Sequence, residues 1–268
     1  MQQDNEFYIG WQAEAPKGVA RMVRRYLLAL ALIVPAFIAL VGYFQRGFSN
    51  AVFEYGKSTE LEGVLNMQPI PFLTVKNGMD AAGKPVFQNI LLVGPGKFGF
   101  AQSAVSDPLP DNAGGNAVRV KGFLIYHDGK TALEVSEIKY KNSSPEYRTS
   151  NIALGTAKLR GEITDPKCLL GVMNPGRGKP HRDCAARCIA GGIPPLLKVA
   201  NADGDAEYYL VVGPEGEALN RQLLDFAADG VEVSGRLEQQ ADWLVLYADP
   251  GSLKRIDKLL LNPGTLCR

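Results

Sequence analysis

The chain has 268 residues, of which 46% are hydrophobic and 21% are charged, and its formal net charge is +1. Such a balance is typical of a folded globular chain and excludes a mainly disordered one. The length has room for roughly two domains. Proteins that bind nucleic acid usually carry a clustered excess of basic residues, so the nearly neutral charge predicts that nucleic acid is not a partner.

An apolar segment near the N-terminus predicts a transmembrane helix. Residues 26–44 (YLLALALIVPAFIALVGYF) contain no charge, and at about 1.5 Å per residue they nearly cross a hydrocarbon core of about 30 Å. Pro35 predicts a kink in this helix. The segment is longer than the apolar region of a cleaved signal peptide, usually about 7 to 15 residues, which favours an uncleaved anchor over that alternative.

The basic residues around this segment predict its orientation. Four of them lie within residues 17–25, before the span, whereas only Arg46 closely follows it. Positively charged flanks stay on the cytoplasmic side. We therefore expect a single-pass protein of a bacterial inner membrane, with a cytoplasmic N-terminus and its remaining mass in the periplasm.

The part after the span contains an internal repeat, and each copy predicts about five short strands separated by turn residues. In the second copy, residues 218–230 have helical spacing before the fourth strand. Three strands, a helix and two strands resemble the layout of the oligonucleotide/oligosaccharide-binding (OB) barrel. The sequence thus predicts a mainly β chain with two tandem OB-like β-barrels. The paired positions are Gly63 with Gly161, Pro71 with Pro195, Val75 with Val199, Gly94 with Gly213, and Gly122 with Gly235.

The repeat also predicts domain boundaries and isolates an insertion in the second barrel, at residues 166–192. Eight positions separate Gly63 from Pro71, whereas 34 separate Gly161 from Pro195. Because the first barrel lacks these residues, we expect them to be dispensable for folding and to carry function. The predicted parts are a cytoplasmic tail (1–25), the transmembrane helix (26–44), a linker (45–58), the first barrel (59–141), a second linker (142–156), the second barrel (157–257) and a C-terminal tail (258–268).

The insertion holds three of the four cysteines and one of the two histidines. A helix through His181, Cys184 and Cys188 would place them on one face, because positions three and four apart are neighbours. With Cys168 they predict one possible four-ligand site for zinc, copper or iron, or a thiolate and imidazole site for haem or an iron–sulfur cluster.

A structural disulfide is the alternative that the sequence favours for these cysteines. Exported proteins usually pair their cysteines, and bridging Cys168 to Cys184 or Cys188 would close a loop of about 16 to 20 residues, worth roughly 3 kcal/mol. Cys267 is either a second partner or a lone thiol near the C-terminus. A reactive thiol pair is a third alternative, with little support because CxxxC is not the CxxC of thioredoxin-like enzymes.

Basic and aromatic residues predict docking surfaces. The basic residues of the insertion lie among glycines and prolines and form a local positive patch, and two aromatic residues of the N-terminal tail suit an interfacial position. No GxSxG or HExxH motif is present, so we expect a non-enzymatic protein. The predicted docking residues are Arg177, Lys179, Arg182, Arg187, Tyr8 and Trp11.

Two stretches, GEITDPKCLLGVMNPGRGKPHRDCAARCIAGGIPP (161–195) and EFYIGWQAEAP (6–16), resemble bacterial membrane-anchored periplasmic proteins that are associated with inner-membrane redox systems. The resemblance implies the same location and a redox context. We therefore expect a subunit without a cofactor that docks on and stabilises a larger redox complex, respiratory or photosynthetic, with other subunits and the lipid bilayer as partners. The alternative is a metal- or haem-bearing electron-transfer protein. Binding of an envelope saccharide rests on the barrel layout alone.

Overall fold

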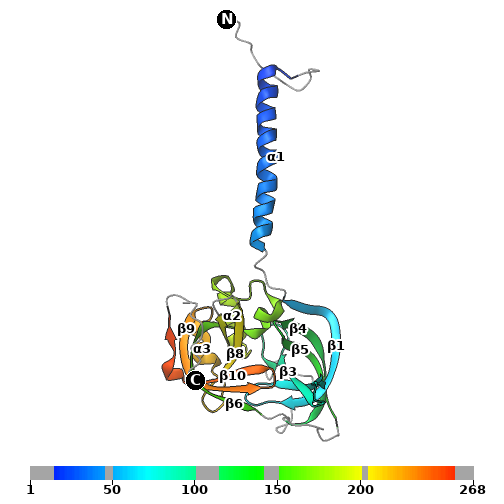
Figure 1. Cartoon of the computed structure of the whole chain (residues 1–268), viewed down its shortest axis with the longest axis vertical. Coiled ribbons are helices and arrows are strands. Elements are labelled where there is room, and N and C mark those ends of the chain that lie inside the picture. The colour runs from blue at the N-terminus through cyan, green and yellow to red at the C-terminus, as the bar shows by residue number, and fades with distance from the viewer. Residues whose placement is uncertain (1–14, 46–50, 101–114, 142–150, 201–204, 257–268) are drawn as a thin grey trace. The chain divides into compact units, whose positions relative to one another are not determined.

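The computed structural model describes residues 15–45, 51–100, 115–141, 151–200 and 205–256 (Figure 1). The chain divides into two compact units, residues 1–48 and 49–268, and each is described by itself. Tyr8, Trp11, Cys267 and the predicted C-terminal tail lie outside the described residues.

The first unit contains helix α1 (Lys17–Gln45), which is long and apolar enough to cross a membrane. Its apolar side chains are exposed on all sides, for example Leu32 and Phe37, an arrangement that lipid stabilises and water does not. The helix begins nine positions before the predicted span, because the alanine, methionine and arginine residues that precede residue 26 are good helix formers. Pro35 lies inside it.

The second unit contains two closed five-stranded barrels. In the first barrel the strands follow the order β1-β2-β3-β5-β4, and β4 closes the ring on β1. Only β3 and β5 pair in parallel; the other neighbours are antiparallel. The strands are β1 (Val52–Asn66), β2 (Phe72–Met79), β3 (Pro85–Val93), β4 (Ala117–His127) and β5 (Lys130–Tyr140).

The second barrel repeats this topology in the order β6-β7-β8-β10-β9, with β8 and β10 as its parallel pair. A short helical segment, α3 (Asn220–Leu223) and η4 (Leu224–Phe226), precedes β9 as predicted. The prediction of two tandem OB-like barrels is confirmed. The strands are β6 (Ile152–Thr164), β7 (Leu196–Ala200), β8 (Ala206–Val212), β9 (Gly230–Gln240) and β10 (Trp243–Ala248), followed by η5 (Pro250–Ser252) and the edge strand β11 (Lys254–Arg255).

Paired glycines explain why both barrels close in the same way. Gly63 lies opposite Val118 in the first barrel, and Gly161 lies opposite Val231 in the second. A Cβ at either glycine would collide with a carbonyl oxygen of the neighbouring strand, and the same holds for the glycine of the fourth strand at position 122 or 235. Only glycine permits so close a backbone approach at these bends.

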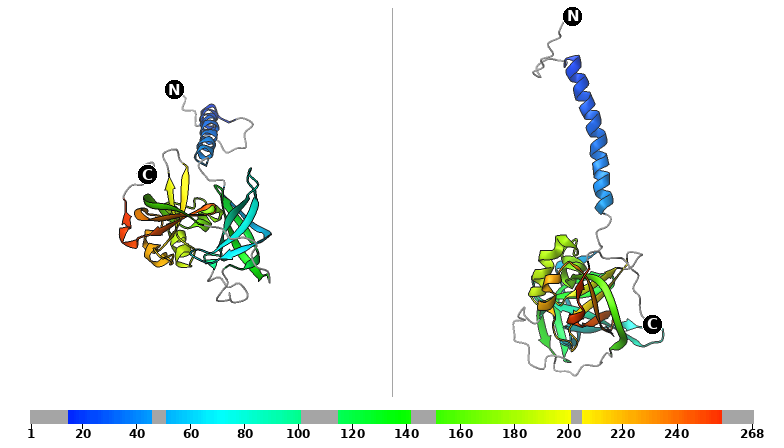
Figure 2. Two further views of the ribbon diagram at one scale, coloured as in Figure 1. Left: turned by 60° about the horizontal axis from the view of Figure 1, so that its bottom comes forward. Right: turned by 90° about the vertical axis from the view of Figure 1, so that its left-hand side faces the viewer.

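The two barrels lie side by side and share an apolar interface (Figure 2). Each barrel has its own core, and a third apolar cluster joins them, with Phe72 and Ile125 from the first barrel and Leu170 and Trp243 from the second. The Trp243 indole N–H donates to the carbonyl oxygen of Asn89, 2.8 Å away. This cluster packs the two barrels against each other.

The insertion is part of this packing, so the expectation that it is dispensable for folding is wrong. Leu169 and Leu170 lie in the cluster between the barrels, whereas Ala185 and Ile189 lie in the core of the second barrel. Removing the insertion would expose both faces. Its elements are η2 (Cys168–Val172), η3 (Lys179–His181) and α2 (Arg182–Ala190).

Two strands begin earlier than the predicted domain boundaries. β1 begins at Val52 and β6 at Ile152, both inside segments predicted as linkers (45–58 and 142–156). The first residues of both strands are rich in β-branched, aromatic and leucine side chains, which favour extended strands.

A candidate metal centre of three cysteines

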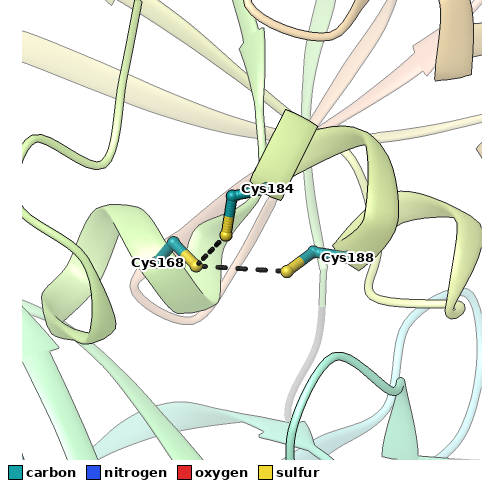
Figure 3. A group of neighbouring side chains, drawn as sticks. All are labelled: Cys168, Cys184 and Cys188. Atoms are coloured by element: carbon teal, nitrogen blue, oxygen red, sulfur yellow. Dashed lines mark hydrogen bonds between the residues drawn. The ribbon is translucent and has the colours of Figure 1, made fainter. Parts of the chain in front are cut away.

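Three cysteine side chains of the insertion converge on one point (Figure 3). Cys168 is the first residue of η2, and Cys184 and Cys188 lie one turn apart on α2, so both point from the same helix face. The Cys168 Sγ atom is 3.6 Å from Cys184 Sγ and 4.0 Å from Cys188 Sγ. Cys168 and Cys188 are buried and Cys184 is half-buried, so the site opens to solvent on the Cys184 side.

The Asp165 carboxylate fixes η2 relative to α2. Its Oδ1 accepts a hydrogen bond from the backbone N–H of Cys168 at 2.9 Å, and its Oδ2 is 2.8 Å from His181 Nε2. Asp165 and His181 are both fully buried. Because His181 directly precedes α2, this one carboxylate links both elements that carry the cysteines.

His181 does not join the cysteine trio, so the predicted four-ligand set is only partly brought together. Its Nδ1 is 3.0 Å from the sulfur of Met173, and its Nε2 faces Asp165. Both ring nitrogens therefore have other neighbours. The physical reason is that α2 begins at Arg182, after a 3₁₀ turn, so the helical spacing assumed for His181 does not apply.

The three thiols are free in the structure, in contrast to the favoured disulfide. A disulfide needs a sulfur–sulfur distance of about 2.05 Å, well below the separations between Cys168 and its two neighbours. The chain brings three sulfurs around one point, and a bridge between two of them would leave the third beside it. The pairing of Cys267 lies outside the described residues.

Lys97, which sequence reasoning missed, brings a cation to the sulfurs. It lies in the loop after β3 of the first barrel, and its Nζ is 2.8 Å from Cys184 Sγ and 4.0 Å from Cys188 Sγ. The hydrogen bond to Cys184 raises the pKa of the Lys97 ammonium. Since 87 positions separate Lys97 from Cys184, nothing in the sequence links them.

The thiols also act on one another. A hydrogen bond from Cys168 lowers the pKa of Cys188, and the nearby charge of Lys97 acts in the same direction. The pKa of Cys168 is raised, chiefly because it donates this bond and also because it is buried. The hydrogen bond between the two thiols thus shifts their pKa values in opposite directions.

A second lysine, Lys167, holds the loop that carries Lys97. Its side chain is 1% exposed, and its Nζ donates to the carbonyl oxygens of Gly94 and Gly96 at 2.7 and 2.6 Å. The same ammonium pairs with Glu134 of β5. Lys167 comes from the second barrel and all its partners from the first, so it fixes the loop against the cysteine site.

The sulfur spacing suits one metal ion. An ion with thiolates at about 2.3 Å holds them about 3.8 Å apart in tetrahedral geometry and about 4.0 Å apart in trigonal geometry. The distances of 3.6 and 4.0 Å from Cys168 Sγ agree with these values. In an iron–sulfur cube each cysteine binds a different iron, which requires wider spacing. The trio can therefore hold a single ion that prefers sulfur.

The predicted docking residues of the insertion are exposed. Arg177, Lys179, Arg182 and Arg187 all reach solvent, and the Arg182 guanidinium pairs with Asp229 at 2.7 Å. Exposure is required of a docking surface, but many surface arginines have no partner protein. Docking by these residues stays a prediction.

No family model and no curated protein matches the chain. Among solved structures it matches a deletion mutant of the single-stranded DNA binding protein from Thermus aquaticus, with 18% identity and a TM-score of 0.24, over 75% of this chain and 94% of that chain. The partner prediction, which excluded nucleic acid, is contradicted by this match and is withdrawn. A likeness at this TM-score carries no argument about what this chain binds.

Proposed function

We propose that the chain is a membrane-anchored, non-enzymatic protein that holds one soft transition-metal ion on the thiolates of Cys168, Cys184 and Cys188. The observation that carries this proposal is the convergence of the three sulfur atoms at metal-ligand spacing. Thiolates are soft ligands that prefer copper(I), zinc and iron to hard ions such as magnesium or calcium.

The surroundings of the sulfurs support a built metal site. The Asp165 carboxylate orients the segment that carries Cys168, and Lys97 offers a positive charge to the thiolates. Contacts of this kind, just outside the ligands, orient the ligands and adjust the affinity for the metal. Electron transfer, the sequence-based alternative, additionally requires a redox-active ion and remains part of the proposal only for copper or iron.

We further propose that α1 is an uncleaved anchor and that residues 49–268 lie in the periplasm. The length and composition of α1 and the excess of basic residues before the span support this orientation. In an oxidising compartment free thiols are converted to disulfides, and a bound metal ion protects its thiolate ligands from this reaction. A periplasmic location is therefore compatible with three unpaired cysteines.

Metal analysis of the full chain, purified in mild detergent, tests the proposed function. We expect about one metal ion per chain in the parent protein and almost none in Cys188→Ser, because two thiolates and a serine hydroxyl bind a soft ion poorly. Cys267→Ser is the matched control and should keep its metal. If the parent protein contains no metal after anaerobic reconstitution with zinc or copper(I), the proposed function is wrong.

A further inference from the structure

The cysteine site is completed by a cation from the other barrel. All three thiols belong to the insertion of the second barrel, whereas Lys97 belongs to the first. The contact is fixed on the backbone: the N–H of Gly99 donates to the carbonyl oxygen of Gly191 at 2.9 Å, and a Cβ at either glycine would collide with the opposite backbone. Lys97 is thus held over the sulfurs before any ion binds.

Among the described residues the trio offers three ligands, and Asp165 and His181 group with Cys168 alone of the three. In the described part of the chain, no other cysteine, histidine or carboxylate groups with all three sulfurs, and Lys97 contacts Cys184. Zinc sites that serve structure almost always have four protein ligands. Copper(I), a soft monovalent ion, is satisfied by three thiolates.

The charge of the loaded site determines how much Lys97 stabilises each ion. Three thiolates with a divalent ion carry a net charge of −1, whereas three thiolates with a monovalent ion carry −2. A largely buried negative charge is unfavourable unless it is paired. The attraction between Lys97 and the loaded site scales with the charge of that site, so the lysine stabilises a monovalent complex about twice as strongly as a divalent one.

Other charged groups near the site are already paired. The Asp165 carboxylate faces His181, and the Lys167 ammonium is bound by Glu134 and two carbonyl oxygens. Among the described residues, the hydrogen bonds from a cation to these sulfurs come from Lys97. Lys97 is therefore the cation that offsets the negative charge of the thiolates and their bound ion.

Building on the proposed function, we infer that the resident ion is copper(I) and that Lys97 is a specificity-determining residue, the counter-cation that lets three thiolates hold a monovalent ion. Lys97 acts through its positive charge. Arginine at position 97 should therefore preserve the preference for copper(I), and a neutral side chain should not. A purely structural lysine would affect both kinds of ion equally.

The test compares copper(I) and zinc(II) binding by the reduced full chain in detergent, each in competition with a chromophoric chelator. Lys97→Met and Lys97→Gln should weaken copper(I) binding about tenfold more than zinc(II) binding, and Lys97→Arg should retain most of the preference. Lys139→Met, which removes a charge from an exposed ion pair, controls for net charge. In a Trp11→Phe background, Trp243 fluorescence confirms that each variant is folded.

Three outcomes decide the inference. A selective loss of copper(I) affinity in both neutral variants supports it. An equal loss for the two ions, or no loss at all, overturns the role of Lys97 while leaving the metal site in place. If the parent protein binds neither ion, the proposed function itself is wrong. The Lys97 variants test only the role of Lys97, so the two failures are distinguishable.

Discussion

Replacing Lys167 with methionine is expected to lower the free energy of unfolding of the two-barrel unit by about 3 to 5 kcal/mol. The substitution leaves the Glu134 carboxylate, with a side chain 11% exposed, without its cation and leaves two carbonyl oxygens without their donor. Breaking a buried ion pair from one side costs more than the pair contributes, because the remaining charge stays buried.

Urea unfolding followed by tryptophan fluorescence measures this loss. The chain has two tryptophans, and in a Trp11→Phe background the emission comes from Trp243, which is fully buried between the barrels. Lys139→Met is the control, since its pair with Glu137 is exposed and should change stability by less than about 1 kcal/mol. Equal midpoints for Lys167→Met and the parent would contradict the assigned role.

Replacing Asp165 with alanine is expected to weaken metal binding about 10- to 100-fold, the usual cost of removing an outer contact that orients a ligand. The carboxylate binds both the backbone of Cys168 and the ring of His181. Without it, η2 and the start of α2 lose their common anchor, and the three sulfurs no longer hold their spacing.

Chelator competition with the full chain measures this affinity. Asp165→Asn keeps one oxygen for the Cys168 N–H and should give an intermediate value. Asp183→Asn, an exposed position on the first turn of α2, should bind metal as the parent does. A parent-like affinity in the alanine variant would mean that Asp165 supports the fold without orienting the ligands.

The barrels were predictable because local signals repeat. Short strands between turn residues, with glycines such as Gly63 and Gly161 at matching bends, predict the same closed topology twice. The convergence of Cys184 and Cys188 follows from their helical spacing. These features depend on neighbours within a few positions, which a single sequence displays.

The features that escaped prediction depend on contacts between distant segments. Lys97 reaches the site only because the two barrels pack together, and Leu169 and Leu170 are buried only because the first barrel lies beside them. The exclusion of nucleic acid rested on net charge, which is a property of the whole chain and says nothing about a single surface. Docking on an inner-membrane redox complex stays a prediction.

X-ray absorption at the edge of the bound metal reports whether three sulfur atoms surround the ion. With one ion on Cys168, Cys184 and Cys188, the spectrum should show three sulfur atoms at about 2.3 Å from the metal, and the small amount of metal that Cys184→Ser retains should have fewer than three sulfur neighbours. Nitrogen and oxygen neighbours alone, or a sulfur count that the Cys184→Ser substitution leaves unchanged, would contradict binding of the ion by the three cysteines.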